Sequence, residues 1–220
     1  SKIPLFLKIL ELSPMTDLSI ESALVKLRRS LLLNRDSLSK NSDLLRFQSA
    51  LALQCFHNEF IYKETEEETF ALRKLEEDAS NKCAYNNENL SEYDIACLAS
   101  YRNLYNYSWA IGLKPPSNLE QLFTRQITEV QKQRQIRCSI PSLEPVENDI
   151  SRAVQNQYEE NPYPRWVNTK LEPKARSIKQ FVNKLELQVK QDIDHLSLHP
   201  QILIAGCGTG QHSIGTASRF

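Results

Sequence analysis

Glycine is rare in this chain, and its distribution limits what the chain can fold into. Only five glycines occur in 220 residues, and four of them (Gly206, Gly208, Gly210 and Gly215) fall within the last fifteen. Glycine marks turns and places where the backbone is closely approached. We therefore expect the first two hundred residues, which contain only Gly112, to be helical. We expect a tight turn within the last fifteen residues.

Helix start signals support a helical interpretation of the first part of the chain. The T-x-x-E pattern of Thr65 and Glu68 predicts a capping box. Other candidate N-caps precede apolar residues at helical spacing, and they are Asp17 or Ser19, Ser91 with Asp94, and Ser117 with Glu120. Four basic residues fall mostly off the apolar face of the helix expected after residue 19 and are expected to be solvated. They are Lys26, Arg28, Arg29 and Arg35.

Two of these helices have distinctive apolar patterns. The helix expected after Asp43 has apolar residues on more than one face, so it is expected to be central and contacted on several sides. The helix expected over 91–112 places Tyr101, Tyr105 and Trp109 at i, i+4 and i+8. Such an aromatic stripe is typical of a core or helix–helix contact. A platform on which bases stack is the alternative.

The composition argues against several classes of protein. The 27 basic and 27 acidic side chains balance, which disfavours a general affinity for nucleic acid or for a membrane surface. No apolar run approaches the roughly twenty residues of a membrane span. The five cysteines form no C-x-x-C pair and no Cys/His group has zinc-ligand spacing. We therefore expect reduced thiols, a cytoplasmic setting and no metal site.

The glycines near the end form a G-x-G-x-G turn between two expected elements. Residues 202–205 are apolar and rich in β-branched side chains, which predicts a buried strand, and residues 211–214 can begin a helix. Such a strand, turn and helix together suit a nucleotide-like or zwitterionic ligand, because the ligand can touch the backbone and helix-opening N–H groups favour negative charge. The spacing fits dinucleotide and ATP-phosphate motifs poorly. An ordinary strand-to-helix connection is the alternative.

A proline-rich segment leads into this turn. Two prolines within residues 139–145 break the helical pattern and predict a domain boundary, and a helix is expected to begin at Asn148 or Asp149. Residues 158–166 follow with two further prolines, which favour an extended, stiff chain. Its aromatic and charged side chains suit either a ligand clamp or a strap that docks on the next domain, and the clamp residues are Tyr158, Tyr163, Arg165 and Trp166. Residues 174–190 predict an amphipathic helix.

The sequence ILIAGCGTG at 202–210 resembles the first motif of class I S-adenosylmethionine-dependent methyltransferases. It departs from that motif at Ile204, where the family usually has an acidic residue near the methionine amine of the cofactor. The resemblance implies S-adenosylmethionine as cofactor. It also implies that the cofactor lies against the main chain of six consecutive residues, which are Ala205, Gly206, Cys207, Gly208, Thr209 and Gly210.

Two further segments extend the resemblance. QYEENPYPRW at 157–166 and FQSALALQCFHNEFIY at 47–62 are similar to segments of bacterial proteins that join tetratricopeptide-type helical repeats to a class I methyltransferase domain. We therefore expect a mainly α chain. It would contain an all-helical bundle at 1–140, a linker and lead-in at 141–200, and the truncated start of a Rossmann-like methyltransferase domain at 201–220.

The expected activity is methyl transfer to an acceptor that the sequence does not identify. A doubly wound domain needs on the order of another hundred residues. We therefore expect this chain to be a piece of a longer protein, inactive by itself, with its catalytic residues beyond Phe220. The helical region is a possible binding site for a protein partner. The alternative function is a helical interaction or scaffold module with a non-catalytic nucleotide-type domain.

Overall fold

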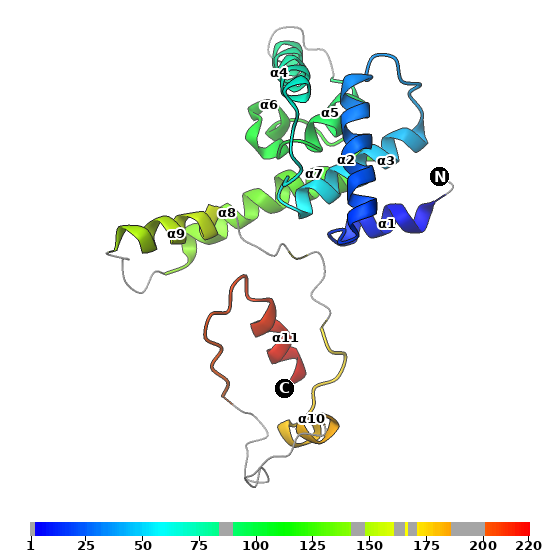
Figure 1. Ribbon diagram of the computed structural model, residues 1–220. Coiled ribbons are helices and arrows are strands. Elements are labelled where there is room, and N and C mark those ends of the chain that lie inside the picture. The colour runs from blue at the N-terminus through cyan, green and yellow to red at the C-terminus, as the bar shows by residue number, and fades with distance from the viewer. Residues whose placement is uncertain (1–2, 84–89, 142–147, 161–165, 167–170, 186–200) are drawn as a thin grey trace. The chain divides into compact units, whose positions relative to one another are not determined.

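The structure is a computed structural model that describes residues 3–83, 90–141, 148–160, 166, 171–185 and 201–220. It divides into two compact units, Ser1–Pro145 and Val146–Phe220 (Figure 1). All regular secondary structure within those ranges is helical, so the prediction of a mainly α chain is confirmed. None of the described helices is both long and apolar enough to cross a membrane.

The first unit is a bundle of short and medium-length helices. In chain order its elements are α1 (Pro4–Leu12), α2 (Leu18–Leu33), α3 (Ser42–His57), α4 (Glu66–Asn81), α5 (Glu92–Ala99), η2 (Leu104–Asn106), α6 (Ser108–Ile111), η3 (Ser117–Leu119), α7 (Glu120–Phe123), η4 (Thr124–Thr128) and α8 (Glu129–Ser139).

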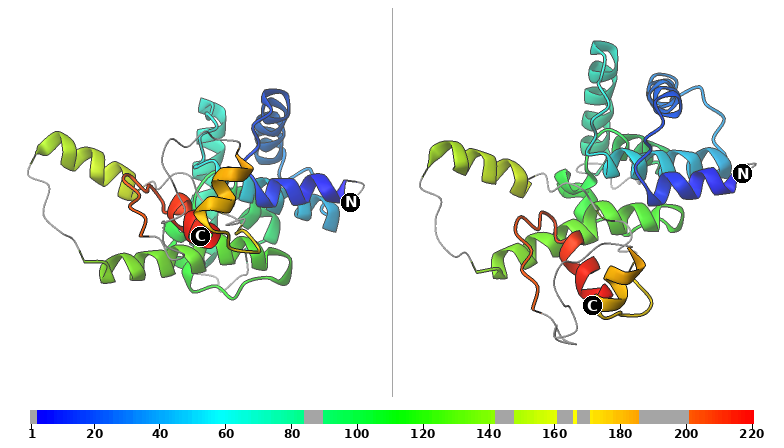
Figure 2. Two further views of the ribbon diagram at one scale, coloured as in Figure 1. Left: turned by 90° about the horizontal axis from the view of Figure 1, so that it is seen from below. Right: turned by 60° about the horizontal axis from the view of Figure 1, so that its bottom comes forward.

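Helix α3 lies at the centre of this unit, as its apolar pattern predicts. It runs beside α1 and also contacts α5 (Figures 1 and 2). Leu51 and Cys55 belong to one core cluster, together with residues of α1 and α2. Ala52 and Leu53 belong to the other, together with residues of α4 and α5. One helix therefore contributes to both cores of the unit.

Two of the predicted N-caps form. The Asp17 carboxylate accepts hydrogen bonds from the backbone N–H groups of Ser19 and Ile20, at 2.9 and 3.0 Å. Thr65 and Glu68 make the reciprocal hydrogen bonds of a capping box at the start of α4. Both caps are local in sequence, which explains why the sequence pattern finds them.

The two other predicted capping boxes do not form. Ser91 is the N-cap residue of α5, but its side chain makes no cap hydrogen bond. Asp94, three residues later, is one methylene shorter than the glutamate of a capping box, so it reaches back less far. Ser117 is the first residue of η3 and follows an extended Pro116. Ser117 therefore does not occupy an N-cap position.

The single helix predicted over 91–112 is interrupted. Helix α5 ends at Ala99, and η2 and α6 follow as separate short elements. The buried Gln126 side chain lies at this interruption, where its Oε1 accepts from the Leu104 N–H at 3.0 Å and its Nε2 donates to the Ala99 carbonyl at 2.9 Å. These hydrogen bonds satisfy backbone groups that a continuous helix would pair internally.

The interruption also separates the aromatic stripe predicted for that helix. Tyr101 lies in the turn after α5, Tyr105 in η2 and Trp109 in α6. Tyr101 is 1% exposed and belongs to the core cluster, while Tyr105 and Trp109 pack against that cluster. These rings therefore lie in or against the core, as predicted, but they do not lie on one helix.

Gln126 reaches the interruption from a π-helical turn. The five residues of η4 lie between α7 and α8 and widen the helix locally. A π-turn inserts an extra residue into the helical repeat and so changes the direction of the side chains near it. Here the buried Gln126 amide also lies 3.5 Å from the Ala52 carbonyl of α3. One side chain thus connects three segments of the first unit.

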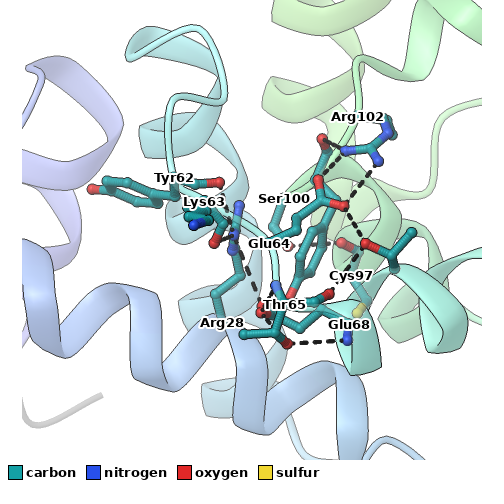
Figure 3. A network of polar contacts seen from close by, with 11 residues as sticks. Arg28, Tyr62, Lys63, Glu64, Thr65, Glu68, Cys97, Ser100 and Arg102 are labelled. Atoms are coloured by element: carbon teal, nitrogen blue, oxygen red, sulfur yellow. Dashed lines mark hydrogen bonds and ion pairs between the residues drawn. The ribbon is translucent and has the colours of Figure 1, made fainter.

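A buried polar network joins α2, α4 and α5 (Figure 3). Arg28 was expected to be solvated, but it is 1% exposed. Its guanidinium donates to the carbonyls of Tyr62 and Lys63, at 3.2 and 3.3 Å, and lies over the Tyr101 ring, 4.1 Å from the ring centroid. The expectation is wrong because a position beside the apolar stripe of α2 faces the segment before α4, which supplies buried carbonyl acceptors.

Glu68 supplies the negative charge of this network. Its carboxylate accepts from the Thr65 N–H at 2.9 Å and from the Tyr101 hydroxyl at 2.7 Å, and it lies 3.9 Å from the Arg28 guanidinium. Arg102 forms a second ion pair with Glu64 nearby. Glu68 therefore both completes the capping box of α4 and is the partner of a buried arginine.

The second unit contains α9 (Asp149–Glu160), α10 (Ile178–Lys184) and α11 (Gln211–Arg219). The helix predicted over 174–190 begins later than expected, at residue 178. Ser177 and Gln180 form a capping box there, which fixes the helix start. The helix also ends earlier than predicted, at Lys184 with Leu185 as its C-cap residue, and residues 186–190 of that prediction lie outside the described ranges.

The strand predicted at 202–205 is not confirmed. Residues 201–204 have no regular secondary structure, and Ile202 and Leu203 are 45% and 94% exposed. A strand is held by hydrogen bonds to a neighbouring strand, and the described residues supply none. Ile202 and Leu203 are therefore exposed and not buried in a sheet, and the following turn and helix form without a strand.

Candidate functional site

The candidate site is the glycine turn, defined as residues 205–210. Gly206, Gly208 and Gly210 have φ angles of 67°, 54° and 85°, all in the left-handed region. A Cβ atom added at Gly206 or Gly208 would meet nothing within 4 Å. Glycine is therefore needed at Gly208 for its backbone conformation, because residues with a Cβ are strained there even where space is free.

Helix α11 begins directly after the turn, as the sequence predicts. Gly210 is its N-cap residue, and the Ile214 N–H donates to the Gly210 carbonyl at 3.0 Å. Among the described residues, no side chain caps this end, and the first turn of α11 has no acidic residue. Its opening N–H groups therefore lack a carboxylate from their own turn, which favours a negatively charged ligand group.

Trp166 contacts the glycine turn from the lead-in segment. Its indole Nε1 donates to the Thr209 hydroxyl at 2.8 Å. Its ring carbon Cζ2 lies 3.8 Å from the position of a Cβ built at Gly210, which is ordinary van der Waals distance. The structure thus brings together two motifs that are 43 residues apart in the sequence.

Of the other predicted clamp residues, Tyr158 lies near the end of α9 and is 67% exposed. Tyr163 and Arg165 fall outside the described residues. Within the described residues, Trp166 is the predicted clamp residue that contacts the turn.

Arg176, just before α10, and Phe181 of α10 contact the C-terminal end of α11. The Arg176 N–H donates to the Arg219 carbonyl at 2.8 Å. The rings of Phe181 and Phe220 meet edge to face, with centroids 5.3 Å apart. The lead-in thus contacts α11 at its C-terminal end and the glycine turn at its N-terminal end. Sequence periodicity does not reveal these pairings because each depends on residues far apart in the chain.

Exposure decides which of the site's groups a ligand could reach. Ala205, Gly206, Cys207 and Gly208 are exposed, whereas Thr209 and Gly210 are partly covered. The main chain of the first four is therefore accessible. Within the described ranges, no group of three or more His, Cys, Asp or Glu side chains could hold a metal ion.

The cysteines provide a direct test of this exposure. Cys138 and Cys207 are exposed, while burial raises the pKa of Cys55 and of Cys97 to about 12. We expect a thiol reagent at pH 8 to label Cys138 and Cys207 rapidly in the folded chain, because the thiolate is the reactive form and must be accessible. Peptide mass spectrometry would identify the labelled residues.

Denatured chain is the control for this labelling, since all five cysteines should then react. Cys83 is partly buried, and burial raises the pKa of its thiol, so it should react more slowly than the exposed pair. Labelling of Cys97 as fast as Cys207 would contradict the packing described for α5.

Comparison of the chain with models of protein families, with curated proteins and with solved structures finds no match. The geometry of the glycine turn and the resemblance carried by its motif are therefore what indicate a function.

In chemical terms, the turn is suited to binding. It combines accessible main chain, left-handed glycines and the uncapped N-terminus of a nine-residue helix. Cys207 is exposed, and its Sγ lies 3.8 Å from the Gly208 carbonyl oxygen. The arrangement of the turn favours recognition of a ligand with an anionic group.

Proposed function

We propose that the glycine turn binds S-adenosylmethionine, and that the chain belongs to a class I methyltransferase whose acceptor is not identified. The observation that carries this proposal is the run of three left-handed glycines directly before the uncapped α11. The G-C-G-T-G sequence at this turn resembles the family's first motif.

The residues present suit such a cofactor. Gly206 and Gly208 leave open space where a Cβ would be, so a ligand can approach the backbone. The opening N–H groups of α11 suit its carboxylate. Ile204 cannot accept a hydrogen bond from the cofactor's amine through its side chain, so the main chain of the turn would have to carry more of the recognition.

When bound, S-adenosylmethionine supplies a methyl group activated by a positively charged sulfur. The chain's own contribution would be to hold that cofactor in a fixed orientation, because correct positioning supplies much of the rate enhancement in such a transfer. Catalytic residues are not assigned within the 220 residues. A cytoplasmic location accords with the unpaired cysteines but stays a prediction.

A substitution at Gly208 tests the cofactor site. We expect S-adenosylhomocysteine to bind in the micromolar range to protein that includes the rest of the methyltransferase domain implied by the resemblance. Gly208→Val should weaken binding by at least about tenfold, because a β-branched residue is strained at this φ of 54°. Isothermal titration calorimetry measures both affinities.

Gly112→Val is the matched control. Gly112 has an ordinary φ of −89°, and an added Cβ there meets nothing within 4 Å. The same substitution should therefore leave the affinity unchanged. No binding by well-folded wild-type protein, or equal affinities for the Gly208 variant and the wild type, would overturn the methyltransferase proposal.

A second candidate function is an interaction module formed by the first unit. Several large apolar side chains there are more than 70% exposed, and they are Leu5, Leu18, Ile61 and Phe70. Exposed apolar side chains of this size can contribute to protein–protein contacts. Failure of the calorimetric test with folded protein would favour this function for the helical region.

A further inference from the structure

Trp166 contacts the glycine turn in two ways at once. Its indole N–H donates to the hydroxyl of Thr209, which stands between two left-handed glycines. Its ring covers Gly210, the residue from which α11 begins. The indole is partly buried, so the contact is shielded from solvent on part of its surface.

A glycine-rich turn gains most from such a contact. Glycine loses more conformational freedom on ordering than any other residue, so a turn with three glycines orders at a high entropic cost. A hydrogen bond at Thr209 and a packed ring at Gly210 limit the backbone conformations that both residues can adopt. A turn that is already ordered does not bear this cost when a ligand binds.

We propose that Trp166 is a positioning residue that fixes the glycine turn in its ligand-binding conformation. It acts through Thr209 and Gly210, and its role differs from that of a clamp in which the indole stacks directly on the ligand. The identity of the ligand rests on the function proposed above. The effect of Trp166 on the conformation of the turn does not rest on that function, because the contact with Thr209 is made within the chain itself.

The first test needs no ligand. The chain has two tryptophans, Trp109 and Trp166, which give two indole N–H signals in a ¹⁵N-correlated NMR spectrum. Thr209→Val removes the acceptor at nearly constant volume. We expect it to shift the Trp166 signal and to speed exchange of that N–H with solvent by about fivefold, the factor expected for loss of one neutral hydrogen bond.

Two internal controls accompany this measurement. Thr209→Ser retains a hydroxyl and should restore the Trp166 signal. The Trp109 signal should not move in either variant, because that ring stacks on Tyr107 in the first unit. A Trp166 signal that is the same in wild type and Thr209→Val would overturn the proposal and leave the cofactor assignment untouched.

The second test measures affinity for S-adenosylhomocysteine in protein with the complete domain. Trp166→Phe keeps a ring over Gly210 but removes the donor. We expect Trp166→Phe and Thr209→Val each to weaken binding by about fivefold, and the double variant to be no weaker than either, because all three lose the same hydrogen bond. Thr209→Ser keeps a hydroxyl acceptor and should bind more tightly than Thr209→Val.

The outcomes separate the two proposals. Fully additive losses in the double variant would mean that Trp166 and Thr209 contact the ligand independently, which would overturn the positioning role. Wild-type protein that shows the Trp166–Thr209 coupling by NMR but binds no S-adenosylhomocysteine would support the positioning role of Trp166. That result would overturn only the identity of the ligand.

Discussion

Gln126→Leu is expected to lower the free energy of unfolding of the first unit by about 2–6 kcal/mol. Leucine is of similar size but cannot replace the hydrogen bonds to the Leu104 N–H and the Ala99 carbonyl. Both backbone groups would stay buried without a partner, at roughly 1–3 kcal/mol each. Urea denaturation followed by circular dichroism measures the change.

Gln133→Leu is the matched control for this variant. Gln133 lies on α8 of the same continuous helical segment, but its side chain is exposed. The same substitution there should change stability by less than about 0.5 kcal/mol. Similar effects of the two substitutions would show that the hydrogen bonds of the Gln126 amide do not stabilise the backbone at the interruption after α5.

Local signals account for what the sequence predicts well. The Thr65 and Glu68 capping box and the Asp17 cap each involve residues within three positions of one another. The central place of α3 follows from apolar residues on several of its faces. The helix start at Gln211 follows from the preceding glycines. In each case the deciding interaction lies within one element and its flanks.

Contacts between distant residues account for what the sequence misses. Asn103 caps η2 locally, since its Oδ1 accepts from the Tyr105 N–H at 3.1 Å. The side chain that satisfies the Ala99 carbonyl and the Leu104 N–H at the helix break belongs to the distant Gln126. The bond from Trp166 to Thr209 likewise joins segments that no helical or strand period connects. Pairing partners are also what the predicted strand at 202–205 requires, and the described residues do not provide them.

Arg28 shows the same limit for a charged residue. By helical position it lies beside the apolar stripe of α2, where a solvated side chain is the simplest expectation. Its burial becomes favourable only through carbonyls of the segment before α4, the Tyr101 ring and the Glu68 carboxylate. The sequence of α2 alone contains none of these partners.

Glu68→Gln is expected to lower the free energy of unfolding by about 3–5 kcal/mol, because it leaves the charge of Arg28 buried without its counterion. The side chains of Arg28 and Glu68 are only 1% and 2% exposed. The amide would also present N–H donors to Thr65 or Tyr101, which donate to the carboxylate in the wild type. Chemical denaturation of the two proteins gives the difference.

A neighbouring ion pair provides the control. Arg29 on α2 follows Arg28, and Glu67 on α4 precedes Glu68. Their guanidinium and carboxylate groups are 2.6 Å apart, and the two side chains are 45% and 62% exposed. Glu67→Gln should change stability by at most about 1 kcal/mol, because solvent screens an exposed pair. Adding Arg28→Met to Glu68→Gln should recover part of the loss, since the unpaired buried charge is then removed.

The pH dependence of the Glu68→Gln effect distinguishes loss of the charge from loss of packing. Burial acts to raise the pKa of Glu68, but hydrogen bonds from Thr65 and Tyr101 and the charge of Arg28 outweigh it, so the pKa lies below its ordinary value. Stability from the ionised carboxylate is therefore fully present above the unfolded-state pKa of about 4.3, and it is lost as the pH falls through the lower folded-state pKa. The stability difference between wild type and Glu68→Gln should accordingly be constant near neutral pH and shrink in acid. A difference that stays the same down to the acid unfolding of the wild type would mean that packing, and not the charge of Glu68, stabilises the junction of α2, α4 and α5.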